Sequence, residues 1–244
     1  MVKFMTLIKS PAAVDAAHFR RHWDSEFLPR FCELPTVRDH LLIAKHNYVL
    51  PAPIREQVPA ADNKWAGAGC YYFDSRAMAE AVLASAEFRG LIGGSRQMLA
   101  EVIPLLVDEV WVHNRDRGYL PIKAFAFFKR LPTFTRLQAL QYYQGPHAAV
   151  GDRINKGRTV RYIQNHVLLD FQNPAPHDYD GGPEIWFKSM DIAMDLYADS
   201  EGMGILAEDE AKFVKRGDLI HFLAEESQLY NREIPDLQSA VNRG

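Results

Sequence analysis

Imidazole, phenol and amide side chains gather in two short segments of the second half of the chain. One segment ends in Gly-Pro-His147, and the other, residues 161–166, reads RYIQNH. In a β-strand alternate side chains share a face, so Tyr162, Gln164 and His166 are expected to point the same way. If that face looks toward covering helices, His147 can lean over it. Two imidazoles and a phenol would then line one small cavity.

Such a set suits proton transfer on a small organic molecule. A neutral His can remove a proton while a second, protonated His or a Tyr donates one to a developing oxyanion. We therefore take His147, His166 and Tyr162 as the candidate catalytic residues. The candidate substrate-binding residues are neighbouring polar and aromatic side chains, namely Tyr143, Gln164, Trp186, His221 and Phe127.

Each of these residues also has a structural interpretation. A His or Tyr on an apolar strand is often a core residue whose polar tip has found a partner. His166 fits both interpretations. For His147 the functional one is favoured, because Gly-Pro-His after a helix gives little structural reason for an imidazole.

The other candidate motifs favour neither a metal nor a cofactor. His18 and His22 have the i, i+4 spacing of a metal-binding pair. No third ligand accompanies them, whereas a zinc site needs three or four, so a solvated helix face is favoured. Gly90 and Gly93 lack the strand-then-helix setting of a dinucleotide loop. We expect no metal and no cofactor.

The chain carries an internal duplication, which becomes visible when its two halves are aligned. The segment VKFMTLIK from residue 2 matches IKAFAFFK from residue 122, at an offset of 120. The offset later falls to 114 and then to 110, as expected if the second copy has shorter loops. The aligned pairs include Lys3 with Lys123, Trp23 with Tyr143, His46 with His166, Phe73 with Phe187, and Asp108 with Asp218.

Each copy reads as strand, helix, strand, strand, helix, strand, with Asp15, Ser75, Thr135 and Ser189 as helix N-caps. This βαββαβ order is the ferredoxin-like split unit, an α+β fold. A sheet of this kind leaves one apolar face bare, and two copies bury both faces by packing sheet against sheet. We predict repeats at 1–117 and 118–226, with a C-terminal extension at 227–244.

The expected fourth strands are Leu106–Val112 in the first copy and Leu219–Leu223 in the second. The second strands are expected at about Leu41–Leu50 and Arg161–Leu169.

The composition is that of an ordinary globular protein of 244 residues with a net charge of −3. Charges of both signs are mixed, so nucleic acid and anionic membranes are not expected as partners. Apolar runs are far shorter than the roughly 20 residues that cross a bilayer. With two cysteines, Cys32 and Cys70, no disulfide framework is expected, and we expect a cytoplasmic location.

The motifs resemble those of the EthD family of dimeric α+β barrel proteins. The residues that carry the resemblance are Tyr142–His147 (YYQGPH) and Arg161–His166 (RYIQNH). The family pattern is a helix ending in an aromatic residue, three further residues and His, then a strand with Tyr-x-Gln-Asn-His. Tyr143 stands where Trp is usual. The first copy carries FRRHW at 19–23 but departs from the pattern, with Phe27 in place of the His.

The resemblance implies a pocket between sheet and helices, with His147 and His166 as an acid–base pair and Tyr162 assisting. The first copy would then serve mainly as a scaffold, or it would contain a pocket lined by different side chains, including His22, His40 or His46. The wider superfamily is similar in fold but diverse in chemistry, so the reaction does not follow from the fold.

The leading hypothesis is a cofactor-independent lyase or isomerase acting on a small aromatic, phenolic, keto or polyketide-like substrate. Dehydration, cyclisation, elimination and decarboxylation all remain open. One alternative is a cofactorless monooxygenase on a similar substrate. Another is a non-catalytic protein that binds a small ligand or haem. Whether the fused pair forms a further homodimer is left open.

Overall fold

The computed structural model describes residues 1–50, 65–116, 118, 120–172 and 178–233. Two compact units make up this part of the chain. The first unit holds residues 1–49, 65–106 and 226–233, and the second holds residue 50 and the described residues of 107–225. No helix among the described residues is both long enough and apolar enough to cross a membrane.

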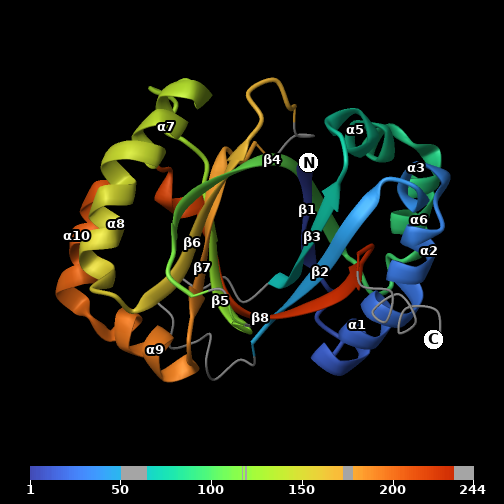
Figure 1. Ribbon diagram of the computed structural model, residues 1–244, viewed down its shortest axis with the longest axis horizontal. Coiled ribbons are helices and arrows are strands. Elements are labelled where there is room, and N and C mark those ends of the chain that lie inside the picture. Colours follow the sequence, from blue (N-terminus) through green and yellow to red (C-terminus); the bar gives the residue numbers. More distant parts are fainter. Residues whose placement is uncertain (51–64, 117, 119, 173–177, 234–244) are drawn as a thin grey trace. The chain divides into compact units, whose positions relative to one another are not determined.

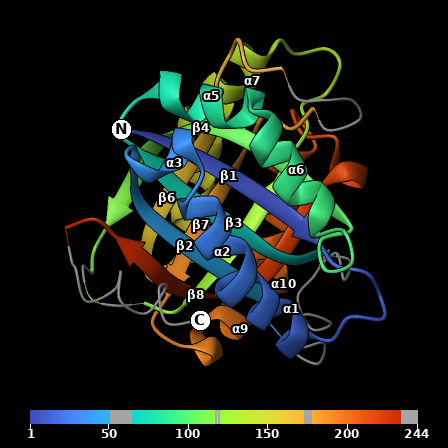
Figure 2. The ribbon, with the colours of Figure 1, turned by 90° about the vertical axis from the view of Figure 1, so that its right-hand side faces the viewer.

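The first unit is an antiparallel sheet with helices on one face, as Figure 2 shows for α1, α2 and α6 over β1, β3 and β2. Its strands follow the order β4-β1-β3-β2-β8. The elements that belong wholly to this unit are β1 (Val2–Lys9), α1 (Ala16–His22), η1 (Trp23–Phe27), α2 (Leu28–Cys32), α3 (Pro35–Arg38), β2 (Leu41–Val49), β3 (Trp65–Phe73), α5 (Arg76–Ala84) and α6 (Ala86–Gly94).

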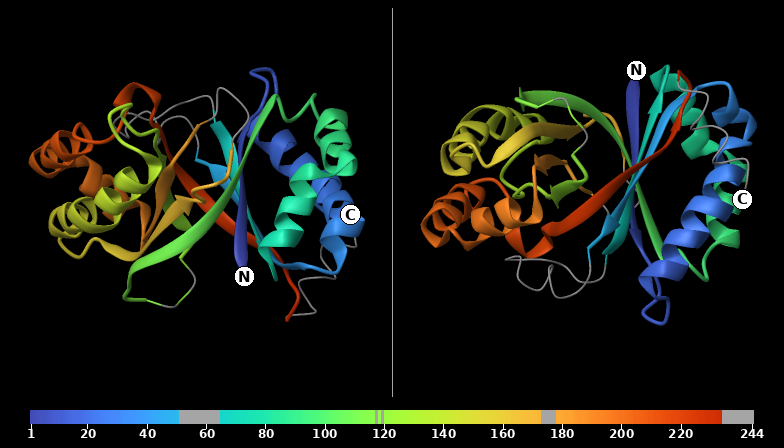
Figure 3. Two further views of the ribbon diagram at one scale, coloured as in Figure 1. Left: turned by 90° about the horizontal axis from the view of Figure 1, so that it is seen from above. Right: turned by 60° about the horizontal axis from the view of Figure 1, so that its bottom comes forward.

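The second unit has the same layering, with α7, α8, α9 and α10 on one face of β5, β6 and β7 (Figures 1 and 3). Its strands follow the order β4-β6-β7-β5-β8. Its elements are β5 (Ile122–Phe127), α7 (Arg136–Tyr142), η2 (Tyr143–His147), α8 (Ala148–Asn155), β6 (Thr159–Val167), β7 (Gly181–Phe187), α9 (Met190–Ala198), α10 (Ser200–Glu210) and η3 (Arg216–Asp218). Two long strands, β4 (Glu101–Asn114) and β8 (Ile220–Asn231), each begin in one unit and end in the other.

Local sequence explains where the helices begin. The Thr135 hydroxyl accepts from the backbone N–H of Gln138, whose side chain reaches back to the Thr135 backbone, so α7 starts with a capping box. Asp15 caps α1 and Ser189 caps α9 by the same kind of bond. Ser75 stands at the N-cap of α5 but its side chain makes no capping bond. The predicted N-caps Asp15, Thr135 and Ser189 are therefore confirmed.

The fourth strand of each unit is longer than expected. The predicted extension at 227–244 begins inside β8, and its residues from 234 onward lie outside the described part of the chain. The predicted boundary at 117 follows β4, whereas the chain changes unit within β4, after residue 106. The end of β8 stays in strand conformation because it lies beside β2, where Lys45 Nζ is 3.3 Å from Glu226 Oε1.

Strand register allows the two units to be compared residue by residue. In the first unit Lys3 of β1 lies opposite Tyr72 of β3. In the second unit Lys123 of β5 lies opposite Trp186 of β7. Lys3 and Lys123 are 120 residues apart, and their partners Tyr72 and Trp186 are 114 residues apart. These are the two offsets that the sequence alignment predicts for the first and third strands.

The second strands correct one pair of that alignment. His46 lies opposite Gly69 in the first unit, and Gln164 lies opposite Pro183 in the second. Because Gly69 and Pro183 differ by 114, the counterpart of His46 is Gln164 and not His166. The connection before this strand is two residues shorter in the second unit, which short sequence matches did not reveal.

The face of the second unit's sheet that is turned away from the helices holds a buried ion pair. Lys123 Nζ lies 2.5 Å from Glu184 Oε2, and both side chains are almost completely buried. Asn165 Nδ2 donates to Glu184 Oε1 at 3.1 Å. These side chains alternate with the helix-facing residues along β5, β6 and β7, so the two faces have separate roles.

We expect the single substitution Glu184→Gln to lower the free energy of unfolding by about 3–5 kcal/mol, because it removes the carboxylate that lies 2.5 Å from the buried Lys123 ammonium. The double variant Lys123→Met/Glu184→Gln is expected to recover part of this loss, since the buried ammonium is removed as well. Urea unfolding measures both, with the exposed Glu208→Gln as control. A Glu184→Gln protein as stable as the parent would contradict the assignment.

Candidate active site

A cavity of about 150 Å³ lies between the sheet of the second unit and its helices, and all the residues that line it belong to that unit. Most of its wall is apolar. Its polar side chains include Tyr143, His147, Tyr162, Tyr197, Glu210 and His221. An engineered apolar cavity of roughly 150 Å³ in another protein holds one benzene molecule. The enclosed space therefore suits a compound with a single ring.

His147 reaches the cavity from the π-helical turn η2, which follows α7 directly. Pro146 lies inside this turn and has no backbone N–H, so the regular α-helical ladder cannot pass through it. Such π-helical turns occur often at functional sites. His147 is 9% exposed, so its imidazole is largely shielded from solvent.

A carboxylate holds His147 in one tautomer. His147 Nδ1 lies 2.9 Å from Oδ2 of Asp209, a buried residue of α10. An ionised carboxylate can only accept hydrogen bonds, so Nδ1 carries the proton and Nε2 holds the basic lone pair. Burial lowers the pKa of His147 below its ordinary value, although Asp209 opposes the shift. The imidazole is therefore neutral at pH 7 and able to act as a base.

Asp209 is itself fixed by two further donors. The Tyr142 hydroxyl donates to its Oδ1 at 2.8 Å, and the Lys212 ammonium donates to the same oxygen at 3.0 Å. Burial raises the pKa of Asp209, but the hydrogen bonds from Lys212, Tyr142 and His147 outweigh it and hold the pKa below the ordinary value. The carboxylate thus stays ionised beside His147. Sequence reasoning missed Asp209, because acidic residues near a helix end look like part of a solvated surface.

The proton of the Tyr162 hydroxyl is directed by Gln164. Gln164 Nε2 donates to the backbone carbonyl of Tyr143 at 2.8 Å and to the Tyr162 hydroxyl at 3.0 Å. A carbonyl can only accept, so the amide nitrogen must face these two oxygens. The Tyr162 oxygen therefore accepts from Gln164, and its own proton is left for another acceptor. Burial raises the pKa of Tyr162 to about 12, so the phenol keeps this proton at neutral pH.

His166 supports this arrangement from outside the cavity. Its Nε2 lies 3.1 Å from Gln164 Oε1, an acceptor, so Nε2 carries the proton. Burial lowers the pKa of His166 to about 4, so the ring is neutral at pH 7. The ring centroid of Tyr143 lies 5.5 Å from that of His166 and 5.6 Å from that of His147. The two predicted catalytic histidines therefore both flank Tyr143, and of the two only His147 is among the residues that line this cavity.

Tyr143 is only 1% exposed, and its buried hydroxyl forms no hydrogen bond of standard geometry with the described residues, although the Tyr162 phenol lies beside it. Burial raises its pKa well above the ordinary value, and the neighbouring Tyr162 phenol adds to the shift. A buried polar atom without a partner costs free energy, so such an atom at a cavity wall is a natural contact for a ligand.

Two further polar groups belong to the same cavity. The Tyr197 hydroxyl lies 2.8 Å from Nε2 of His221, a predicted binding residue. Glu210, at the end of α10, was not predicted; its Oε2 is 3.4 Å from Arg216 Nε. Burial raises the pKa of Glu210 to about 7, although Arg216 opposes the shift.

Trp186 and Phe127, two of the predicted substrate-binding residues, are not among the residues that line this cavity. Along β7 the cavity-lining residues are Pro183 and Ile185, so Trp186 faces the opposite side, where it packs with Ile163 and lies under the Lys123 ammonium. The alternation of side chains in a strand explains this placement. Along β5 the cavity-lining residues are Ala124, Phe125 and Ala126, and Phe127 beyond them stacks on the ring of Phe125, with centroids 6.1 Å apart.

The first unit carries a carboxylate–imidazole pair at a different position. His46 is fully buried, with Nδ1 2.8 Å from Asp24 Oδ1 and Nε2 3.1 Å from the Tyr71 hydroxyl. Its ring stacks on Trp23 with centroids 3.8 Å apart. Because protein groups occupy both ring nitrogens, His46 has the contacts of a structural histidine. Phe27 is buried at the end of η1, the position that His147 holds in η2.

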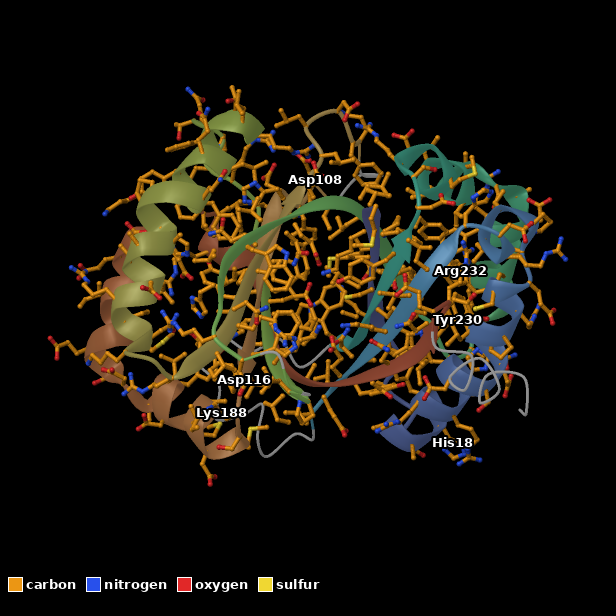
Figure 4. The ribbon with its side chains drawn as sticks, viewed as in Figure 1. His18, Asp108, Asp116, Lys188, Tyr230 and Arg232 are labelled. Carbon is orange, nitrogen blue, oxygen red and sulfur yellow. The ribbon has the colours of Figure 1, made fainter. Side chains whose placement is uncertain are left out.

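Each of the remaining histidines considered in the sequence bonds to one carboxylate. His18 bonds to Asp15 and projects from the outer side of α1 in Figure 4, while His22 bonds to Glu26. His40 bonds to Asp74. Among the described residues no three His, Cys, Asp or Glu side chains come together to hold a metal ion.

A haem group does not fit the site as the structure shows it. One imidazole nitrogen, Nε2 of His147, faces the cavity and is of the type that ligates haem iron. The enclosed volume of about 150 Å³, however, accommodates one ring, whereas a haem macrocycle contains four pyrrole rings.

Comparisons with known proteins identify the fold and the second unit. Residues 131–217 match the family model described as EthD domain. An anthrone oxidase-like protein of known structure superposes with a TM-score of 0.66 at 10% identity, covering 93% of this chain and 92% of its own. A chlorite dismutase mutant from Candidatus Nitrospira defluvii superposes with a TM-score of 0.52 at 9% identity, covering 99% and 94%.

These structures share the dimeric α+β barrel fold, and at such low identity the likeness concerns the fold alone. No curated protein sequence matches the chain. The match at residues 131–217 covers η2, β6 and α10, the elements that carry His147, Tyr162 and Asp209. The resemblance inferred from the sequence is thus confirmed: residues 131–217 of this chain match the model of the EthD domain.

Proposed function

We propose that this protein is an enzyme that removes a proton from a small aromatic or enolisable substrate in the cavity of the second unit, and completes a lyase or isomerase reaction without a cofactor. The observation that carries the proposal is the Asp209–His147 pair, whose Nδ1–Oδ2 distance is 2.9 Å and whose imidazole lines an otherwise mostly apolar cavity. A neutral imidazole oriented by a buried carboxylate is the usual form of a protein general base.

The proposed first step takes a proton from an acidic C–H or O–H of the substrate to His147 Nε2. The electron pair left behind moves onto the substrate's carbonyl oxygen, which accepts the proton or a hydrogen bond from the Tyr162 hydroxyl. Asp209 stabilises the imidazolium that forms. Gln164 supports the phenol because it keeps the Tyr162 proton pointing away from the amide.

The second step returns the proton from His147. Delivery of the proton to another carbon gives isomerisation, and delivery to a departing oxygen gives dehydration. In a cyclisation the carbanion first forms a bond to a second carbonyl carbon of the substrate, and the proton goes to the alkoxide oxygen that this addition creates. None of these outcomes needs an oxidant, and each restores the starting protonation of the enzyme. Residues of helices α8, α9 and α10 line the cavity and restrict the access of water to it, which strengthens the electrostatic contribution of each donor.

A cofactorless monooxygenase is the second candidate, and the structural neighbour named as anthrone oxidase-like favours it. In that reaction the same deprotonation by His147 comes first, and the resulting carbanion passes electrons to O₂. The two candidates therefore share the base and differ in the fate of the carbanion.

The arrangement of the chain supports a tandem origin for the site. We propose that the units are two ferredoxin-like repeats, because helix and π-helical turn recur at an offset of 120, as Ala16–His22 with Trp23–Phe27 and Arg136–Tyr142 with Tyr143–His147. With Phe27 where the second unit has His147, the first unit would serve as the scaffold. The proposed partner is a small aromatic or keto substrate.

We expect His147→Asn and Asp209→Asn each to slow proton abstraction by roughly 10²–10⁴-fold, the usual contribution of a general base and of its orienting carboxylate. The probe is 4-hydroxyacetophenone in D₂O, with NMR used to follow exchange of its methyl protons. Tyr142→Phe is the matched control, because it keeps both the imidazole and the carboxylate and is expected to cost much less. Folded variants that exchange as fast as the parent would remove His147 from the mechanism.

The pH profile of the same exchange tests the state of the base. The rate is expected to rise with pH through the pKa of His147, which lies below 6.5, and then to level off, because only the neutral imidazole accepts a proton. Asp209 raises this pKa, so Asp209→Asn is expected to move the rise to lower pH. A rise that is unchanged in Asp209→Asn would contradict the proposed coupling.

Oxygen separates the two candidate reactions. For the lyase or isomerase, turnover of an identified substrate is expected to be equal in air and under argon, with no oxygen uptake at an electrode. Oxygen consumption equal to substrate loss, absent in His147→Asn, would establish the monooxygenase instead.

A further inference from the structure

Two polar residues of the cavity, Tyr143 and Glu210, have no role in the proton transfer described above. Together they offer one hydrogen-bond donor and one acceptor to a ligand. The buried Tyr143 hydroxyl forms no hydrogen bond of standard geometry with the described residues. The Glu210 carboxylate, 15% exposed, lines the same cavity. Both groups therefore border one space of about 150 Å³.

We propose that Tyr143 and Glu210 form a hydroxyl-recognition site, so that the cavity selects a one-ring substrate with a free hydroxyl group, a phenol or an enol. A hydroxyl both accepts and donates one hydrogen bond. It can accept from the Tyr143 phenol and donate to the Glu210 carboxylate. An ether lacks the proton that Glu210 requires, and a carboxylate ligand would place a second negative charge against it.

The surroundings of Glu210 agree with this role. Arg216 Nε approaches Oε2 at 3.4 Å from η3, and its side chain is about half exposed. Asp209 on the same helix and the phenols of Tyr143 and Tyr197 lie within electrostatic range. Burial raises the pKa of Glu210 to about 7, so at pH 8 the group is mainly an acceptor.

This inference rests on the proposed function for the identity of the cavity, and it adds the class of substrate. Desolvated hydrogen bonds to a charged group discriminate strongly, because the analogue that lacks the hydroxyl leaves buried polar atoms unpaired. The size of the enclosed space makes phenol itself a suitable probe.

The test is calorimetric titration of the full-length protein at pH 8 with phenol, anisole, toluene and benzoate. Phenol is expected to bind roughly 10–100-fold more tightly than anisole, the range that a hydrogen bond to a charged group supplies. Glu210→Gln and Tyr143→Phe are each expected to bring this ratio below about 3 while leaving toluene affinity unchanged. Glu208→Gln, an exposed change on the same helix, is the control and is expected to keep the ratio.

Benzoate gives a second readout. It is expected to bind the parent protein more weakly than toluene and to gain affinity in Glu210→Gln, where the repelling charge is gone. Equal affinity for phenol and anisole, or a ratio that both variants preserve, would overturn the proposal. Benzoate binding more tightly than phenol would also overturn it, because Arg216 would then set the polarity of the site.

The same measurements separate this inference from the proposed function. His147→Asn is expected to keep the phenol preference while losing proton abstraction. Loss of selectivity with intact proton abstraction would reject only the hydroxyl site, and retained selectivity with no dependence of abstraction on His147 would reject only the catalytic assignment.

Discussion

The hydrogen bond between His147 and Asp209 is the interaction on which the chemistry of this molecule depends. A buried imidazole without the carboxylate could hold its proton on either nitrogen, and only one tautomer presents a lone pair to the cavity. Asp209 lies far from His147 in sequence, on α10, so the bond forms only when α10 packs beside the π-helical turn. Tyr142 and Lys212 then keep the carboxylate ionised, which preserves the acceptor that the imidazole needs.

The sheet of the second unit separates two kinds of polar environment by the alternation of its side chains. One face supplies Tyr162 and Gln164 to the helices, where hydrogen bonds orient a phenol proton. The other face holds the Lys123–Glu184 ion pair, which is fully buried and makes no contribution to the cavity wall. A shift of one residue in register would exchange these faces, so the buried charges on one side also secure the position of the phenol on the other.

The two units show how one local framework can support different interiors. Both contain a π-helical turn after the first helix, and both bury a carboxylate–imidazole pair. In the first unit the imidazole comes from β2, and Asp24 and the Tyr71 hydroxyl occupy both of its nitrogens. In the second the imidazole comes from the turn itself and keeps one nitrogen toward the cavity. Phe27 ends the π-helical turn of the first unit, whereas His147 ends that of the second.

Local patterns in the sequence determined the order of strands and helices and the N-caps at Asp15, Thr135 and Ser189, because these depend on neighbours within a few residues. They did not determine the partner of His147 or the positions of Trp186, Phe127 and His166 outside the cavity. Those features, together with Glu210, depend on register between strands and on how helix α10 packs. Contacts between segments that are distant in sequence determine these features. Only the folded chain shows which polar atoms are buried side by side.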